Sequence, residues 1–264
     1  MYTGKLFLCL DTLTKPEKNE FRDFVRSPFF NKNEDTMRFL DIIFGDEEKK
    51  LSKEQVFQLL FRGSKYDARK ITDQVYYLTR LAEQFLSYRK FSADPTLQNI
   101  NLLSECLDRS IEKMALAVAG NIESQFKETE FLDYNYYYRE YMYQAELDRY
   151  YVGRENIKRD ESLQKKADSL DLFFIYARLR DCCEMLNRTQ IIQSSYRMPM
   201  LDYVKAYVEE YLSDFEKYPA IGIYYHILLM LQNPETDEHF NKLMNLLDSK
   251  YSFFPDIELR DMYN

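Results

Sequence analysis

Apolar side chains recur along most of the chain at the three- and four-residue spacing that is typical of amphipathic helices. Near the N-terminus, Phe21, Phe24 and Val25 stand at positions i, i+3 and i+4. Two segments, Thr14–Glu17 and Ser52–Gln55, open with a hydroxyl residue that is followed three residues later by an acid or an amide. This capping-box pattern marks the start of a helix. The pattern therefore predicts a chain of helices that are joined by short turns.

The same periodicity sets approximate bounds for the elements. We predict helices over residues 5–13, 14–27, 33–45, 52–63, 67–90, 96–118, 121–152, 162–192, 200–215, 219–232 and 236–250, and a last one from 256 onward. The helix over 121–152 is expected to break near Glu130, and a charged loop is expected over 153–161. Since the last helix has room for barely two turns, we expect the chain to be truncated at its C-terminus.

Glycine and proline are scarce, which strengthens the helical prediction. Together they number 13 of 264 residues, whereas average usage would be about 12%. Pro219 and Pro255 open two predicted helices 36 residues apart, close to the tetratricopeptide period of roughly 34. We therefore predict an all-α fold, in which an N-terminal helical unit leads into a stack of antiparallel helix pairs, a tetratricopeptide-like α-solenoid.

The distribution of charge suggests two domains. Residues 1–92 carry 17 basic and 14 acidic side chains, whereas residues 93–264 carry 19 basic and 30 acidic ones. We predict a domain boundary at this change. The net charge of −8 disfavours general affinity for phosphate backbones.

The cysteines and the apolar runs bear on cellular location. Cys9, Cys106, Cys182 and Cys183 fit neither a disulfide framework nor a C-x-x-C motif, so we expect reduced thiols, of which Cys106, Cys182 and Cys183 are expected to be buried. The longest apolar run, 220–231, is too short to cross a membrane. We expect a cytoplasmic protein with no membrane association.

Motifs that carry catalytic chemistry are missing. The two closest glycines, Gly45 and Gly63, are too far apart for a phosphate-binding loop, and no G-x-S-x-G motif occurs. The two histidines, His226 and His239, form no metal-ligand motif. We expect no enzymatic activity, no cofactor and no metal.

Tyrosines are concentrated between Tyr134 and Tyr151 in the helix predicted over 121–152, where they lie on two nearly opposite faces. Such a helix packs between neighbours, yet aromatic and arginine side chains are also the usual anchors of protein interfaces. We predict that a peptide or protein partner binds here, and the protein is expected to be a non-enzymatic interaction scaffold. The expected contact residues are Tyr134, Tyr137, Tyr141, Arg149, Tyr151 and Arg154.

Two nucleic-acid alternatives stay open. Residues 52–90 could form a DNA-binding helix-turn-helix, in which Arg69, Lys70, Arg80 and Arg89 would face DNA. Residues 134–166 combine tyrosines with six basic side chains from Arg149 to Lys166, a composition that could bind RNA. The acidic side chains among them, and the acidic chain as a whole, favour the protein-binding interpretation.

The run from Phe21 to Asn33, F-R-D-F-V-R-S-P-F-F-N-K-N, resembles the opening of a family of bacterial all-helical proteins. The segments Tyr224–His226 and Phe253–Pro255 are similar to that family as well. The resemblance implies further helix pairs beyond this length and a tetratricopeptide-like stack. It implies no activity and no functional residues.

Overall fold

The computed structural model describes residues 3–46, 48–129, 132–152, 161–192, 195–213, 217–235 and 237–250, together with positions 254, 256 and 259. In these residues the chain forms twelve α-helices and no strand. The prediction of an all-α fold is therefore confirmed. The helices divide into two compact units, residues 1–94 and 95–264, which are called unit 1 and unit 2 below.

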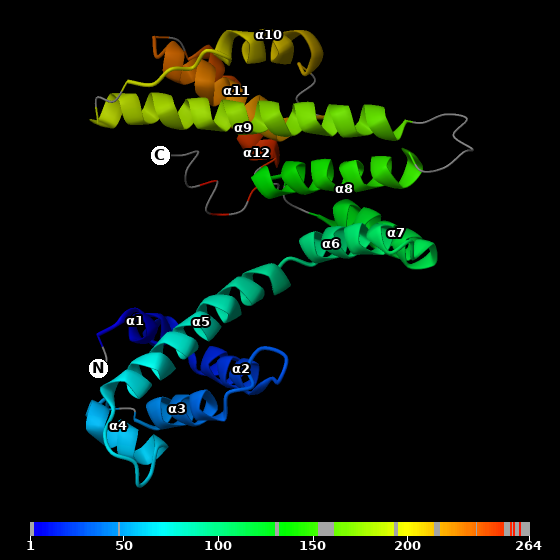
Figure 1. Ribbon diagram of the computed structural model, residues 1–264. Helices are drawn as coiled ribbons and strands as arrows, with labels where there is room; N and C mark the ends of the chain where they lie inside the picture. The colour runs from blue at the N-terminus through cyan, green and yellow to red at the C-terminus, as the bar shows by residue number, and fades with distance from the viewer. Residues whose placement is uncertain are drawn as a thin grey trace. The chain divides into compact units, whose positions relative to one another are not determined.

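Unit 1 is built around one long helix. Its helices are α1 (Lys5–Thr12), α2 (Lys15–Arg26), α3 (Glu34–Gly45), α4 (Lys53–Leu60) and α5 (Ala68–Ser92). The four shorter helices all contact α5, which runs along the unit (Figure 1). Short loops between sequential helices keep each helix next to its neighbours.

The two capping boxes form as the sequence predicts. The Thr14 amide donates to Glu17 Oε2 over 2.6 Å, and the Glu17 amide donates back to Thr14 Oγ1 over 3.4 Å. Ser52 and Gln55 exchange the same pair of hydrogen bonds at the start of α4. Each box satisfies amides that the first helical turn leaves without an intrahelical acceptor.

The core of unit 1 combines leucine and phenylalanine, and all of its buried aromatic rings are phenylalanines. The buried rings are Phe7, Phe21, Phe24, Phe39, Phe57 and Phe85. Phe21 packs against Phe85 with ring centroids 5.2 Å apart. The spacing of apolar residues in α4 would bury Leu59, but Leu59 is exposed and Phe57 is buried.

Unit 2 contains seven described helices. They are α6 (Pro95–Asp108), α7 (Glu112–Glu128), α8 (Tyr134–Val152), α9 (Ser162–Ile192), α10 (Leu201–Tyr211), α11 (Pro219–Gln232) and α12 (Glu238–Lys250). The main packed pairs are α6 with α7, α8 with α9, and α11 with both α9 and α12. The architecture is therefore one of packed helix pairs. These pairs alone do not establish a repeat solenoid, because the helix lengths range from 11 to 31 residues.

One predicted boundary in unit 2 is wrong. The chain does not continue as one helix over 96–118, because α6 ends at Asp108 and α7 begins at Glu112. Ser110 takes a left-handed φ of 55°, and the Ile111 amide donates to the Cys106 carbonyl oxygen over 2.8 Å while the Ser110 amide donates to Leu107. This is a Schellman ending, in which serine occupies the position that glycine usually holds.

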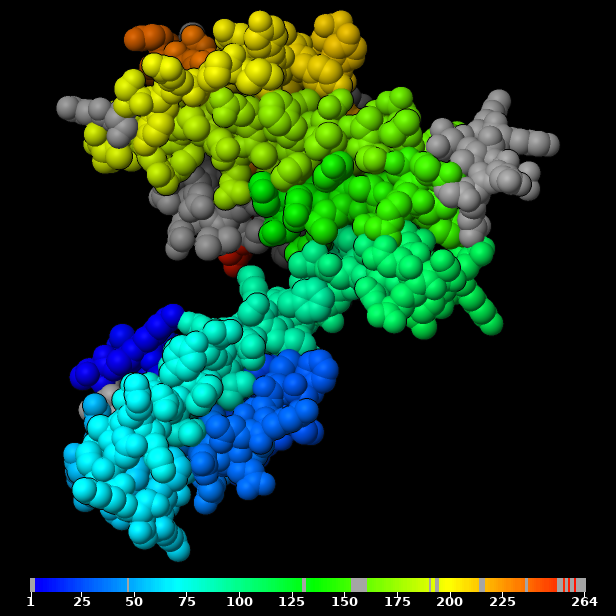
Figure 2. All heavy atoms as spheres, in the orientation of Figure 1, coloured from blue at the N-terminus to red at the C-terminus, as the bar shows by residue number. Residues whose placement is uncertain are grey.

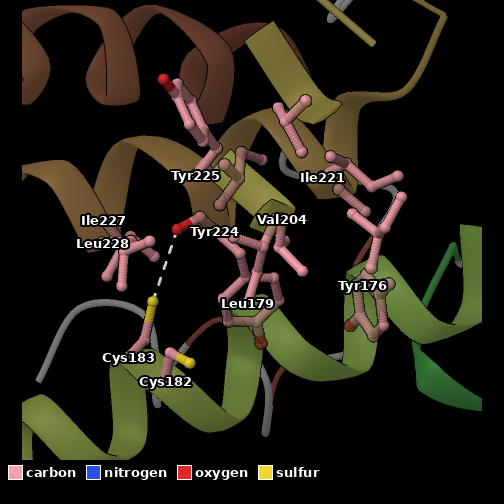
Figure 3. Packing of buried hydrophobic residues seen from close by; sticks show 14 of the residues in the cluster. Tyr176, Leu179, Cys182, Cys183, Val204, Ile221, Tyr224, Tyr225, Ile227 and Leu228 are labelled. Atoms are coloured by element: carbon pink, nitrogen blue, oxygen red, sulfur yellow. Dashed lines mark hydrogen bonds between the residues drawn. The ribbon is translucent and has the colours of Figure 1, made fainter. Parts of the chain in front are cut away.

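The centre of unit 2 is α11, whose residues from Pro219 to Leu229 are all buried. Figure 3 shows the side chains of Leu179 and Cys183 on α9 directed toward α11. The Cys183 thiol donates to the Tyr224 carbonyl oxygen over 3.4 Å. Cys106, Cys182 and Cys183 are buried and free, as the sequence predicts. The predicted loop over 153–161, apart from Glu161, and most of the predicted helix from 256 lie outside the described residues.

Candidate partner-binding surface

The tyrosine-rich helix α8 starts at an aspartate cap. Asp133 Oδ1 accepts a hydrogen bond from the Tyr136 amide over 2.9 Å, the bond that an N-cap side chain typically accepts. From this start, α8 runs beside α9 along the chain's longest helix contact. Figure 2 shows the side chains of α8 and α9 filling the space between the two helices. The burial of each tyrosine therefore depends on the side of α8 from which it projects.

The six residues predicted to bind a partner have different surroundings. Tyr134 and Tyr151 are exposed, Tyr141 is half-buried, and Arg154 lies outside the described residues. Tyr137 is only 4% exposed, and its ring stacks on that of Tyr176 at 5.0 Å. Burial raises the pKa of Tyr137. Its choice as a surface anchor is therefore corrected, because the side chain belongs to the core of unit 2.

Arg149 joins two helices of unit 2. Its Nη2 donates to the Ser104 carbonyl oxygen over 3.0 Å and to Asp108 Oδ1 over 2.9 Å. Its Nη1 lies 3.3 Å from Glu146 Oε2. Ser104 and Asp108 lie at the C-terminal end of α6, where a cation is favourable because it faces the negative end of the helix dipole. Arg149 therefore acts as a clamp from α8 to the C-terminal end of α6.

A second polar contact joins α8 to α9. Asp148 is buried, and its Oδ2 accepts a hydrogen bond from Lys166 Nζ over 2.7 Å. Ser162 Oγ donates to the other carboxylate oxygen over 3.4 Å. The Asp148 carboxylate raises the pKa of Lys166. The sequence analysis missed this pair, because no local pattern connects residues that are 18 positions apart on different helices.

An aromatic cluster with two exposed tyrosines and a half-buried phenylalanine does form between α8 and α9. It consists of Tyr134, Tyr138, Phe173 and Arg180, which we call the α8–α9 surface. The Tyr134 and Tyr138 rings lie 5.2 and 5.4 Å from that of Phe173. The Arg180 guanidinium lies over the Tyr134 ring at 5.8 Å. Tyr138 is 40% exposed, although the sequence analysis did not select it as a contact residue.

The two histidines meet although they lie on different helices. The rings of His226 on α11 and His239 on α12 stack with centroids 5.6 Å apart and 26° between their planes. Burial, reinforced by His239 and Lys242, lowers the pKa of His226 to about 4. Among the described residues, no group of three or more histidine, cysteine or acidic side chains is placed to hold a metal.

The basic side chains of α5 are not equally available. Arg69, Lys70 and Arg80 are exposed. Arg89, however, forms ion pairs with Glu17 and Glu20 of α2. The hydrogen bonds from the Thr14 amide and from Arg89 lower the pKa of Glu17 to about 2. Three of the four basic residues named for DNA contact thus remain open to solvent.

In the part of the chain that the structure describes, no helix is both long enough and apolar enough to cross a membrane. No family model, no curated protein and no solved structure matches this chain. The likeness of the Phe21–Asn33 segment to a bacterial helical family therefore stays a prediction, and the fold stands as an all-helical protein of packed pairs.

Proposed function

We propose that the protein is a non-enzymatic interaction scaffold that binds a protein or peptide partner at the α8–α9 surface. The observation that carries the proposal is the cluster in which exposed Tyr134 and Tyr138 pack on the half-buried ring of Phe173. Tyrosine offers a large contact area at a low cost in conformational entropy, and arginine and tyrosine dominate interface energetics. Because the cluster stands on two helices that pack along their length, its rings are held in place before binding.

The finer architecture is part of the same proposal. We infer that the helix pairs of unit 2 form a tetratricopeptide-like α-solenoid, whose stacked pairs offer an extended binding surface. The short link between α6 and α7 and the contact of α9 with both α8 and α11 support this. Free thiols at all four cysteines fit a cytoplasmic scaffold.

The basic side chains of 134–166 favour a protein partner over RNA. Arg149 contacts Asp108 and Glu146, Lys166 contacts Asp148, and Lys165 lies 3.8 Å from Glu161. A groove for single-stranded RNA needs cations that are free to follow the backbone. These three cations are instead neutralised by nearby carboxylates of the same unit.

A photo-crosslinking amino acid at position 138 tests the proposal. We expect it to form a protein adduct in extract from the native cell, because the Tyr138 side chain is an exposed member of the cluster. The matched control is the same substitution at Leu163, an exposed residue of α9 that is not part of the cluster. An adduct that forms equally at both positions, or one that nuclease removes and protease does not, would contradict the proposal.

A further inference from the structure

A hollow of about 720 Å³ lies on unit 1, between the loop after α2 and the exposed side of α5. Its walls include Phe30, Lys32, Tyr76, Tyr77 and Arg80, and buried Leu81 also lines it. A second hollow of about 610 Å³ shares Arg80 and Gln84 with the first and continues along α5 to Phe91. We call the two hollows together the α5 groove.

The loop that forms one wall is held rigidly by its own hydrogen bonds. Asn31 is buried, and its Nδ2 donates to the Val25 carbonyl oxygen over 2.9 Å, while its Oδ1 accepts from the Asn33 amide over 2.9 Å. Asn33 Oδ1 in turn caps α3. Below the loop, the buried Thr36 Oγ1 donates to Gln74 Oε1 over 2.7 Å, which fastens α3 to α5. The wall is therefore formed before any ligand arrives.

This rigid loop presents two phenylalanines at the surface. The Phe30 ring stacks on Phe24 with centroids 3.9 Å apart, and Phe29 meets Phe30 edge-on at 5.0 Å. Phe29 is 86% exposed, the highest value among the exposed large apolar side chains of the described residues. Leaving such a ring in water forgoes the stabilisation of burial, about 1.5–3 kcal/mol for a side chain of this kind. A preorganised, exposed aromatic pair is a suitable anchor for a ligand.

The charge of the groove indicates what the ligand carries. Lys32 and Arg80 are exposed and line the first hollow, which has no carboxylate among its lining residues. Neither cation forms an ion pair with another described residue, although Arg80 Nη1 donates to the Tyr76 hydroxyl over 3.3 Å. Glu83, which lines the second hollow, is paired with Lys5. The hydrogen bond from Lys5 lowers the pKa of Glu83, and the charge of Arg80 reaches this carboxylate and helps to lower it. The groove thus combines an apolar wall with two cations that form no ion pair with a described carboxylate.

We propose that the α5 groove binds an acidic peptide segment of a partner protein, in which an aromatic or aliphatic side chain stands next to aspartate or glutamate. The apolar side chain would pack against Phe29 and Phe30, and the carboxylates would pair with Arg80 and Lys32. From Tyr77 to Phe91 the groove follows α5 for roughly 20 Å, which matches about six residues of extended peptide. Two cations are too few to follow a nucleic-acid backbone, for which a continuous positive groove is expected.

The inference rests on the scaffold function proposed above, but it concerns a different surface on the other unit. Selection of random dodecapeptides on the full-length protein, followed by fluorescence anisotropy with the most enriched labelled peptide, tests it. We expect enriched sequences that place Asp or Glu beside Phe, Leu or Ile. Arg80→Glu is expected to weaken binding by about tenfold or more, and Phe29→Ala by several-fold.

The matched control is Arg69→Glu, which makes the same charge change at an exposed position of α5 outside the groove. It is expected to leave the affinity within about twofold of wild type, and circular dichroism should show that every variant is folded. The inference is overturned if the enriched sequences are basic or random. It is also overturned if both charge variants lose the same peptide affinity, or if oligothymidylate binds more tightly than the selected peptide. So would a protein that is dimeric through this groove and becomes monomeric in Arg80→Glu.

The two proposals can fail separately. If an adduct forms at position 138 but no peptide binds the α5 groove, the scaffold function stands and the groove proposal is contradicted. If the selected peptide still binds Tyr138→Ala and no adduct forms at position 138, the α5 groove proposal stands and the α8–α9 surface proposal is contradicted.

Discussion

The two units differ in whether tyrosine enters the core. In unit 1 the buried aromatic rings are all phenylalanine, while its described tyrosines, Tyr66, Tyr76, Tyr77 and Tyr88, are exposed. In unit 2 the core takes up tyrosine instead. Its buried rings include Tyr137, Tyr143, Tyr176, Tyr224 and Tyr225. The units thus differ in where they place the phenolic hydroxyl group.

This difference determines which unit contains buried groups that can ionise. The core cluster of unit 1 contains none among its fully buried members. In unit 2, burial raises the pKa values of Tyr143, Tyr225 and Cys183 and lowers that of His226. Each buried hydroxyl also needs an acceptor, as when the Tyr143 hydroxyl donates to Glu123 Oε1 over 3.1 Å. We therefore expect unit 1 to be insensitive to moderate changes of pH, and unit 2 to respond to them.

The largest effect on stability is expected from removal of a buried aromatic ring in unit 1. Phe21 is fully buried, so Phe21→Ala should lower the free energy of unfolding of unit 1 by about 3–5 kcal/mol. Because unit 2 has separate core clusters, hydrogen exchange should accelerate in α2 and α5 but not in α9 and α11.

Phe29→Ala is the control, because this ring is exposed and its loss should change stability by no more than about 0.5 kcal/mol. If Phe21→Ala accelerates hydrogen exchange in α11 as much as in α5, the two cores unfold together, and the two units are not independent.

A smaller effect is expected from mild acid, and chiefly in unit 2, because the lowered pKa of Glu17 in unit 1 makes that unit sensitive only below the ordinary glutamate pKa of 4.5. The ordinary pKa of histidine is 6.5, and that of folded His226 is about 4. Between these values the unfolded chain binds a proton that the folded chain does not bind. The free energy of unfolding should therefore fall as pH drops from about 6.5 to about 4, by about 3 kcal/mol in total. Urea unfolding followed at a series of pH values measures this loss.

His226→Gln should remove most of that pH dependence, whereas His239→Gln should keep it, because burial is the main cause of the shift. The interpretation fails if the two variants lose the same share of the pH dependence. It also fails if α5 loses as much protection from hydrogen exchange in acid as α11 does.

The smallest effect concerns Arg149, which the sequence analysis selected for partner binding. The structure gives it partners on α6, so Arg149→Ala should destabilise unit 2 by about 1 kcal/mol. Lys165→Ala, which removes only an exposed ion pair between α9 and Glu161, the residue that precedes it, should cost less than about 0.5 kcal/mol. Equal melting temperatures for the two variants would argue against the clamp.

Local signals predicted much of the fold. The capping boxes at Thr14 and Ser52 correctly mark the starts of α2 and α4, and the bounds of α9 match the prediction. The break between α6 and α7 escaped prediction, because the left-handed residue is Ser110 and neither glycine nor proline marks the turn. Chain-local periodicity thus identifies helices well and their unusual endings poorly.

The candidate surface was harder to predict than the helices. Tyrosine is both apolar and polar, so periodicity alone could not separate buried Tyr137 from exposed Tyr138. The partners of Arg149 lie 41 and 45 residues away on another helix, and only the tertiary structure shows them. The α5 groove was missed because its walls come from two segments, the loop at Phe30 and the helix at Tyr76, which are brought together by packing.

Chemical nitration of tyrosine at neutral pH, with the modified positions mapped by mass spectrometry, tests the contrast between the two units most directly. Nitration in the folded protein depends on access to the ring. We expect Tyr76, Tyr77 and Tyr88 of unit 1 to be modified in the folded protein, as are exposed tyrosines of unit 2 such as Tyr203, while buried Tyr176 and Tyr224 of unit 2 stay protected until the protein unfolds. Modification of Tyr176 and Tyr224 at the rate of Tyr76 and Tyr77 would contradict the account.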